Sequence, residues 1–349
     1  MGCTVRTGGV RGAVLRWSAL ALAVCAAFAA VAGPAVARPR AAGTPKEAAV
    51  PASRWIAVSV ATLWVKPGLA RPVDAPSTAA AADPRAWVAG MTTAQKRWLV
   101  GKLETQVLYG ARVILLATSG SWSRVAVPGQ PTPRDARGYP GWVPSRQLTT
   151  TRPETGQGVA VIRRPTAWAW QTPSLTGRAL ELSCGTRLPA VGWTPEAVKI
   201  AMLDGRRLYV KRAAVALRSR GAASPRPTGA QLVAEARRFL GLQYLWAGTS
   251  GFGPDCSGFT YLVYRALGVT IPRDAAPQAA AGVRVARASL RAGDLVFFRS
   301  SSGQIHHVGM FVGSGRMIHA AATGLPVSVV SLSAEPYSRE YAGGRRYVP

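Results

Sequence analysis

Short apolar runs separated by turn residues fill the N-terminal part of the chain. They lie at residues 55–65, 107–109, 112–117, 122–127 and 141–144. Short β-type runs with a turn about every eight to twelve residues are typical of a small barrel or sandwich. Residues 92–103 differ, because a threonine-led capping motif at their start predicts a short helix.

A second set of β-type runs follows the first and partly repeats it. These runs lie at residues 158–162, 168–170, 186–192, 198–202 and 207–210. Residues 198–202 followed by 208–210 echo 122–127 followed by 141–144. Each pair closes with a helical-looking turn and an apolar residue, Leu148 or Val215. The echo predicts two small barrels of one type, at residues 54–150 and 151–218, the first enlarged by an insertion near 71–103.

The pattern changes after a linker at residues 219–228. Residues 231–241 and 256–268 carry apolar positions at the three-to-four spacing of amphipathic helices, and each ends in glycine. Strand-like runs then lie at 294–299, 307–312, 316–320, 327–332 and 345–348. Helices followed by antiparallel strands predict an α+β domain over residues 229–349.

The first residues predict an export signal. Three arginines precede an apolar run at residues 17–32, and an A-x-A cleavage site ends at Ala37. The run is too short for a confident membrane span, so we expect a secreted or envelope protein with no transmembrane anchor in its mature form. A lipoprotein signal at Cys25 is an alternative, although Val24 is bulky for that position. Residues 38–53 are rich in Pro, Ala and charge and predict a linker.

The charge is strongly positive, at +28 from 43 basic and 15 acidic residues. One explanation is a genome-wide bias toward arginine, and the other is attraction to a polyanion. The basic residues are dispersed and form no nucleic-acid-binding module. We therefore expect an anionic cell-wall polymer, rather than nucleic acid, as the partner if the charge is functional.

Cys256 is the candidate nucleophile. It opens a predicted helix, where the helix dipole favours a thiolate. All three histidines lie downstream, and a cysteine with a nearby histidine is the arrangement of a cysteine hydrolase. Adjacent residues of a strand face opposite sides, so we expect only one of His306 and His307 to face the cysteine. Cys184 is expected to be a free, buried thiol.

Five motifs in order resemble one known family. They are Tyr244-Leu245-Trp246-Ala247-Gly248, Asp255-Cys256-Ser257-Gly258-Phe259, Gly293-Asp294-Leu295-Val296-Phe297-Phe298, His307-Val308-Gly309-Met310 and Met317-Ile318-His319-Ala320. Together they resemble the NlpC-type cell-wall peptidases, which have a papain-like fold, over residues 228–349. Residues 54–218 are similar to the pair of bacterial SH3-like domains that precede this domain in some members.

The resemblance implies a cysteine peptidase that cleaves peptidoglycan stem peptides between γ-D-glutamate and the diamino acid. It implies Cys256 as nucleophile, His307 as base and His319 as the residue that orients the base. The backbone N–H of Cys256 and the Tyr244 hydroxyl would stabilise the oxyanion. No cofactor is implied. Two histidines on adjacent strands without matched carboxylates also make a poor zinc site.

Substrate-binding residues are implied in the same way. Asp255 either caps its helix or meets the amino end of the substrate, and Ser257 and Arg273 would also contact it. Glu104 and Tyr139 match an acid and a tyrosine that bind the free amino group of L-Ala in some members. Relatives often have a serine after the Arg273-Asp274 pair, where this chain has alanines, which puts one substrate contact in doubt.

Two other functions stay open at this point. A wall-binding protein with an inactive third domain would not require an intact Cys256, His307 and His319. An amidase or acyltransferase on a related scaffold would not require the Tyr244 and Asp255 motifs.

Overall fold

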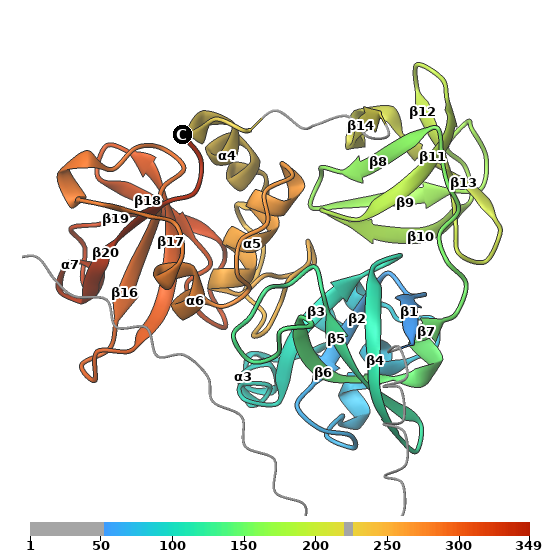
Figure 1. The fold of residues 1–349 in the computed structure, drawn as a ribbon, viewed down its shortest axis with the longest axis horizontal. Coiled ribbons are helices and arrows are strands. Elements are labelled where there is room, and N and C mark those ends of the chain that lie inside the picture. Colours follow the sequence, from blue (N-terminus) through green and yellow to red (C-terminus); the bar gives the residue numbers. More distant parts are fainter. Residues whose placement is uncertain (1–51, 220–225) are drawn as a thin grey trace, which may run out of the picture. The chain divides into compact units, whose positions relative to one another are not determined.

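The computed structural model describes residues 52–219 and 226–349 (Figure 1). The predicted signal peptide, nearly all of the linker at 38–53 and most of the linker at 219–228 lie outside the described residues. The described residues form three antiparallel sheets, two of seven strands and one of six, together with short helices. Within these residues no helix is long and apolar enough to cross a membrane.

The first sheet has the strand order β3-β2-β6-β5-β4-β1-β7. Its strands are β1 (Ser53–Ile56), β2 (Val60–Trp64), β3 (Leu103–Leu108), β4 (Arg112–Ser119), β5 (Trp122–Val127), β6 (Tyr139–Pro144) and β7 (Leu148–Thr149). The single run expected at 55–65 is therefore wrong, because the chain leaves the sheet between β1 and β2. There the Ala57 N–H bonds the Gln147 carbonyl at 2.9 Å, and the Ser59 carbonyl accepts from Tyr109 N–H at 3.1 Å.

The second sheet has the order β10-β9-β13-β12-β11-β8-β14, which is the order of the first sheet counted from β8. Its strands are β8 (Gly158–Ile162), β9 (Thr166–Trp170), β10 (Arg178–Ser183), β11 (Arg187–Trp193), β12 (Ala197–Ala201), β13 (Arg207–Lys211) and β14 (Val215–Ser219). A 3-10 turn precedes the last strand in both sheets, at Ser145–Gln147 and Arg212–Ala214. The shared strand order supports the internal repeat that the sequence echo predicted.

An insertion between β2 and β3 carries three short helices. They are α1 (Ala75–Thr78), α2 (Pro84–Gly90) and α3 (Thr93–Trp98), preceded by a 3-10 turn at Pro72–Asp74. The expected capping motif of α3 is present, because the Thr92 side chain accepts from Gln95 N–H at 3.2 Å. The helix ends earlier than predicted, since residues from Leu103 onward belong to β3.

The third sheet has the order β15-β20-β16-β17-β18-β19, and four helices accompany it. The helices are α4 (Gly229–Ala236), α5 (Cys256–Ala266), α6 (Ala275–Ala280) and α7 (Tyr337–Glu340), with 3-10 turns at Arg237–Phe239 and Arg287–Ser289. The strands are β15 (Val283–Val285), β16 (Leu295–Arg299), β17 (Ile305–Gly313), β18 (Arg316–His319), β19 (Ser328–Ser331) and β20 (Tyr341–Arg346). Phe259, Leu262 and Val263 of α5 pack in one core with Val308 and Met310 of β17. This packing fixes the start of α5 against the middle of the sheet.

Candidate active site

The sequence places Cys256 at the first position of α5. Asp255 is its N-cap, and an Asp255 carboxylate oxygen accepts from Gly258 N–H at 2.7 Å. Asp at this position satisfies one of the N–H groups that the first helical turn leaves without a partner. The N–H of Cys256 itself has no acceptor within the helix. It is therefore available to a negative oxygen bound beside the sulfur.

Two histidines on adjacent strands form a buried, hydrogen-bonded pair. Nε2 of His307 on β17 lies 2.8 Å from Nδ1 of His319 on β18. The bond uses Nε2 of His307, so Nδ1 is the ring nitrogen left for a thiol. The backbone N–H of Val308, the next residue along β17, donates toward the Cys256 sulfur. His306 is exposed, as strand alternation predicted, and pairs with Glu340 at 3.1 Å.

Burial keeps the resting cysteine and histidines neutral. Desolvation, followed by the charge of Asp255, raises the pKa of the Cys256 thiol to about 12. Desolvation, followed by the nearby histidines, lowers the pKa of His307 to about 3, and desolvation alone lowers that of His319 to about 4. The expected stabilisation of an isolated thiolate by the helix dipole is therefore outweighed. A thiolate in this site forms together with protonation of an adjacent base.

Arg273 joins the residues that flank the nucleophile. Only 1% of it is exposed, and its guanidinium donates to Asp255 at 2.7 Å and 3.2 Å and to the Ser257 hydroxyl at 2.9 Å. Burial of a carboxylate is costly unless it is paired and hydrogen-bonded. The pair therefore offsets the cost of burying Asp255 where it caps α5. These three residues are the ones that the sequence predicts near the substrate, and the structure brings them together.

Tyr244 lies beside the same group. It is 7% exposed and belongs to the core that contains Cys256. Burial, followed by the charges of Asp255 and Cys256, raises the pKa of its phenol, which stays a protonated donor. Within residues 52–219 and 226–349 its hydroxyl makes no hydrogen bond. That donor is available to a bound molecule.

The first sheet closes one side of this group through β3. The Thr105 hydroxyl accepts from Arg273 Nε at 3.0 Å. Gln106 of β3 and Thr249, in the loop before α5, form two hydrogen bonds with each other. The Gln106 N–H donates to the Thr249 hydroxyl at 2.9 Å, and the Thr249 N–H donates to the Gln106 side chain at 3.1 Å. Residues of the N-terminal region therefore lie in direct contact with the loop that precedes Cys256.

Glu104 and Tyr139 lie together, but a residue that sequence analysis missed joins them. The guanidinium of Arg134 makes a two-pronged ion pair with Glu104, one prong at 2.8 Å, and donates to the Tyr139 hydroxyl at 3.2 Å. Tyr139 in turn donates to Asp274 at 2.9 Å. Arg134 lies in the Pro- and Gly-rich loop before β6, and nothing in the sequence except its charge indicated a place in this group. Asp274 follows Arg273 directly, and that adjacency was its only signal.

Cys184 lies between β10 and β11 and packs into the same core as α4 and α5. It is completely buried, as expected, but its thiol donates to the Glu235 carboxylate at 3.8 Å rather than contacting apolar atoms alone. Glu235 is also paired with Arg163. Among the described residues, no three His, Cys, Asp or Glu side chains gather as a metal site would require. The chemistry that this arrangement supports is attack by a cysteine sulfur with a histidine as proton acceptor.

Comparison with known proteins identifies relatives along most of the chain. The model of the NlpC/P60 family matches residues 241–346. The chain is 40% identical over 302 residues to a gamma-D-glutamyl-L-lysine dipeptidyl-peptidase of Bacillus cereus, covering 84% of this chain and 91% of the relative. It is 37% identical over 292 residues to the protein of the same name from Bacillus subtilis, covering 82% and 96%. A crystal structure of an NlpC/P60 family protein from Bacillus cereus matches with a TM-score of 0.80 and 39% identity, covering 85% of this chain and all of that one.

The buried histidines predict a loss of stability in acid. Unfolding exposes imidazoles with a pKa near 6.5, whereas folding holds those of His307 and His319 at about 3 and about 4. The unfolded chain therefore binds more protons below pH 6.5, and we expect the free energy of unfolding to fall as the pH drops from 6.5 toward 3. Denaturant titrations of the native chain and of His319→Gln across this range measure the effect. We expect a shallower fall in the variant, and equal slopes would contradict the assignment.

Proposed function

Because the chain belongs to the NlpC/P60 family, we propose that it is a cysteine peptidase that hydrolyses peptidoglycan stem peptides between γ-D-glutamate and the diamino acid. The observation that carries the proposal is the bonded pair of His307 and His319, together with the bond from the N–H of Val308, the residue after His307, to the sulfur of Cys256. The names of the two Bacillus relatives support the choice of bond.

The geometry supports a two-stage reaction. Nδ1 of His307 takes the thiol proton as the Cys256 sulfur attacks the amide carbonyl carbon, while His319 keeps the ring oriented through its bond to Nε2. The Cys256 N–H and the Tyr244 hydroxyl then hold the negative oxygen. His307 returns the proton to the leaving amine, which leaves a thioester on Cys256. Water deprotonated by His307 attacks the thioester, releases the γ-D-glutamyl carboxylate and restores the thiol.

We further propose the finer assignments of the fold and compartment. The two repeated sheets would be SH3-like barrels, and the third sheet with its helices a papain-like catalytic domain. The shared strand order and the placement of Cys256 on the leading helix support this reading of the fold. The N-terminal signal at residues 1–37 would direct the chain outside the membrane, where peptidoglycan and its anionic polymers lie.

The group of Glu104, Tyr139 and Asp274 would bind the free amino group of an N-terminal L-Ala. An ammonium would donate hydrogen bonds to both carboxylates and to the tyrosine oxygen, whereas an N-blocked stem would lack the positive charge that these carboxylates bind. The guanidinium of Arg134 pairs with the Glu104 carboxylate. We propose that the substrate ammonium displaces the guanidinium, so that Arg134 weakens the binding of free-amine stems.

Replacing Cys256 by Ala removes the nucleophile. We expect release of diamino acid products from L-Ala-γ-D-Glu-diamino acid peptides to fall at least about a thousandfold. Cys184→Ala is the matched control, since it removes the other mature thiol outside the site. Chromatography with mass detection of digested peptides measures both, and turnover by Cys256→Ala near the native rate would exclude this mechanism.

Replacing Glu104 by Gln removes the proposed partner of the ammonium. We expect KM for free-amine stems to rise about 10- to 100-fold, because a charge-assisted bond is lost, with much less change for N-acetylated stems. Arg134→Ala should lower KM for free-amine stems, and this gain should vanish in the Glu104→Gln background. If Glu104→Gln raised KM equally for free-amine and acetylated stems, these residues would not recognise the amino group. The same would follow if Arg134→Ala still lowered KM in the Glu104→Gln background.

A further inference from the structure

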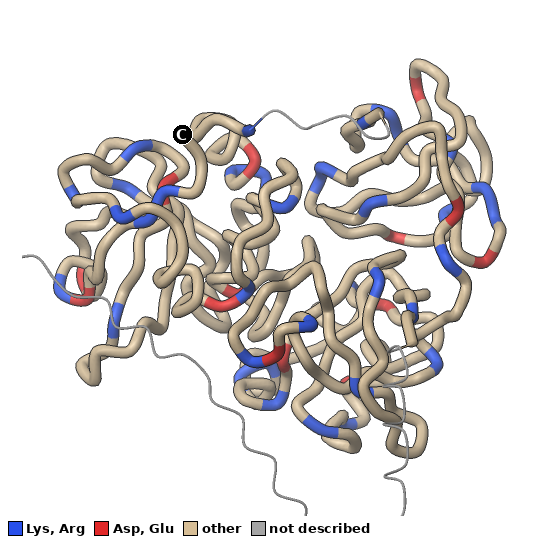
Figure 2. Tube along the Cα trace, viewed as in Figure 1, with Lys and Arg blue, Asp and Glu red and all other residues tan. Residues whose placement is uncertain are grey.

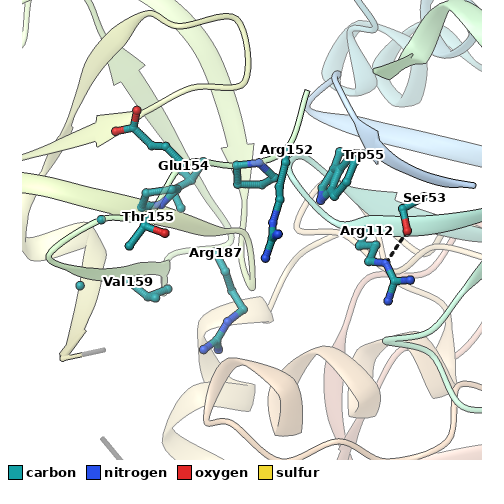
Figure 3. A pocket seen from close by; sticks show the side chains of 13 residues that line it. Ser53, Trp55, Arg112, Arg152, Glu154, Thr155, Val159 and Arg187 are labelled. Carbon is teal, nitrogen blue, oxygen red and sulfur yellow. Dashed lines mark hydrogen bonds between the residues drawn. The ribbon is translucent and has the colours of Figure 1, made fainter. Parts of the chain in front are cut away.

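An arginine-lined cavity lies between the first two sheets, apart from Cys256 and its histidines (Figure 3). It measures about 650 Å³. Arg112 and Trp55 line it from the first sheet and Arg187 from the second, and Arg152 lines it from the segment that joins them. In Figure 3 the side chains of Arg152 and Arg187 extend in the same direction, and Glu154 extends the opposite way. Three cations therefore border one space.

These cations lack anionic partners in the described chain. Neither Arg152 nor Arg187 makes an ion pair or a side-chain hydrogen bond within residues 52–219 and 226–349. Arg112 donates to the Ser53 hydroxyl at 2.9 Å. Glu154, the one acid in the lining, is already paired with Arg207 at 2.7 Å. The cavity thus carries net positive charge that no neighbouring carboxylate neutralises.

The charge continues into a second, smaller cavity of about 220 Å³. Arg112 lines both cavities, and Arg265 of α5 lines the smaller one. Burial, followed by the positive charges of Arg265 and Arg218, lowers the pKa of Arg187. Arginine nevertheless stays charged in proteins. Like charges gathered in this way favour an anion that bridges them, and guanidinium groups bind phosphate oxygens in a matched two-pronged geometry.

We propose that the two cavities form one binding site for an extended polymer of glycerol or ribitol joined by phosphodiesters. Adjoining cavities that share an arginine suit a ligand with several anionic groups rather than a single ion. Figure 2 shows basic residues spread over the whole described chain, so the general field attracts polyanions, whereas the cavity offers a defined place for one.

The lining favours such a polymer over single-stranded nucleic acid. Proteins that bind single strands stack successive bases on several aromatic rings. The larger cavity presents one aromatic side chain, Trp55, and the smaller presents Tyr261, whose ring already carries the Arg265 guanidinium at 5.8 Å. Binding of a phosphodiester chain without bases requires arginine side chains for its phosphates but no aromatic rings for stacking.

Binding of a soluble glycerol-phosphate polymer by the full chain, measured by calorimetry at several salt concentrations, tests the site. Arg152→Glu/Arg187→Glu should weaken binding at least about tenfold and make its salt dependence shallower, because fewer phosphate contacts remain. Arg284→Glu/Arg316→Glu is the matched control, since it makes the same change in net charge at exposed positions of β15 and β18 and should weaken binding far less. Equal weakening by both would reduce the site to general charge attraction and overturn the proposal.

Four further measurements make the result interpretable. Arg152→Gln/Arg187→Gln, with a melting temperature for each variant, covers the case in which charge reversal prevents folding, and it should also weaken binding. An oligothymidylate with as many phosphates should bind less tightly, as should inorganic phosphate, and equal or tighter binding of either would contradict a phosphodiester polymer without bases. Cys256→Ala should bind the polymer like the native chain, so a failure of the proposed hydrolysis and a failure of this site are distinguishable.

Discussion

The residues that flank the nucleophile are held together by the hydrogen bonds of one buried guanidinium, that of Arg273. It bonds Asp255 and Ser257 on either side of the nucleophile, and it bonds Thr105 in the first sheet. Its backbone N–H also donates to the carbonyl of Pro131 at 3.0 Å. Because removing one member of a buried ion pair leaves an uncompensated charge, all of these groups are held in place together.

This constraint explains why the N-terminal region contributes to a site whose cysteine and histidines come from the C-terminal region. Through Arg273 and Thr249, strand β3 is fixed against the loop before α5. That contact brings Glu104 and Tyr139 toward Asp274 and the nucleophile. Reactive groups and proposed recognition groups therefore come from separate parts of the sequence, and the first sheet is bonded directly to the residues that flank the nucleophile.

Much of this could be predicted from the sequence, and the failures have physical causes. The Cys256 helix and the strands of the two histidines were predictable because apolar spacing and strand alternation are local patterns. The strand β10 was missed because Glu181 divides its few apolar residues and Arg178 begins it. The prediction that the helix dipole would favour a thiolate at Cys256 was wrong, because the burial that raises the pKa of the thiol depends on the whole fold. Arg134 could not be found, since its pairing with Glu104 joins residues far apart in the sequence and its loop has no regular pattern.

Amide hydrogen exchange in Arg273→Gln tests the central role of this guanidinium most directly. Two amides report on the two sides of the junction, those of Gly258, which bonds Asp255, and Gln106, which bonds Thr249. The account predicts faster exchange at both in the variant, while the amide of Val125 within β5 of the first sheet keeps its native rate. Native rates at Gly258 and Gln106 in a folded variant would contradict it.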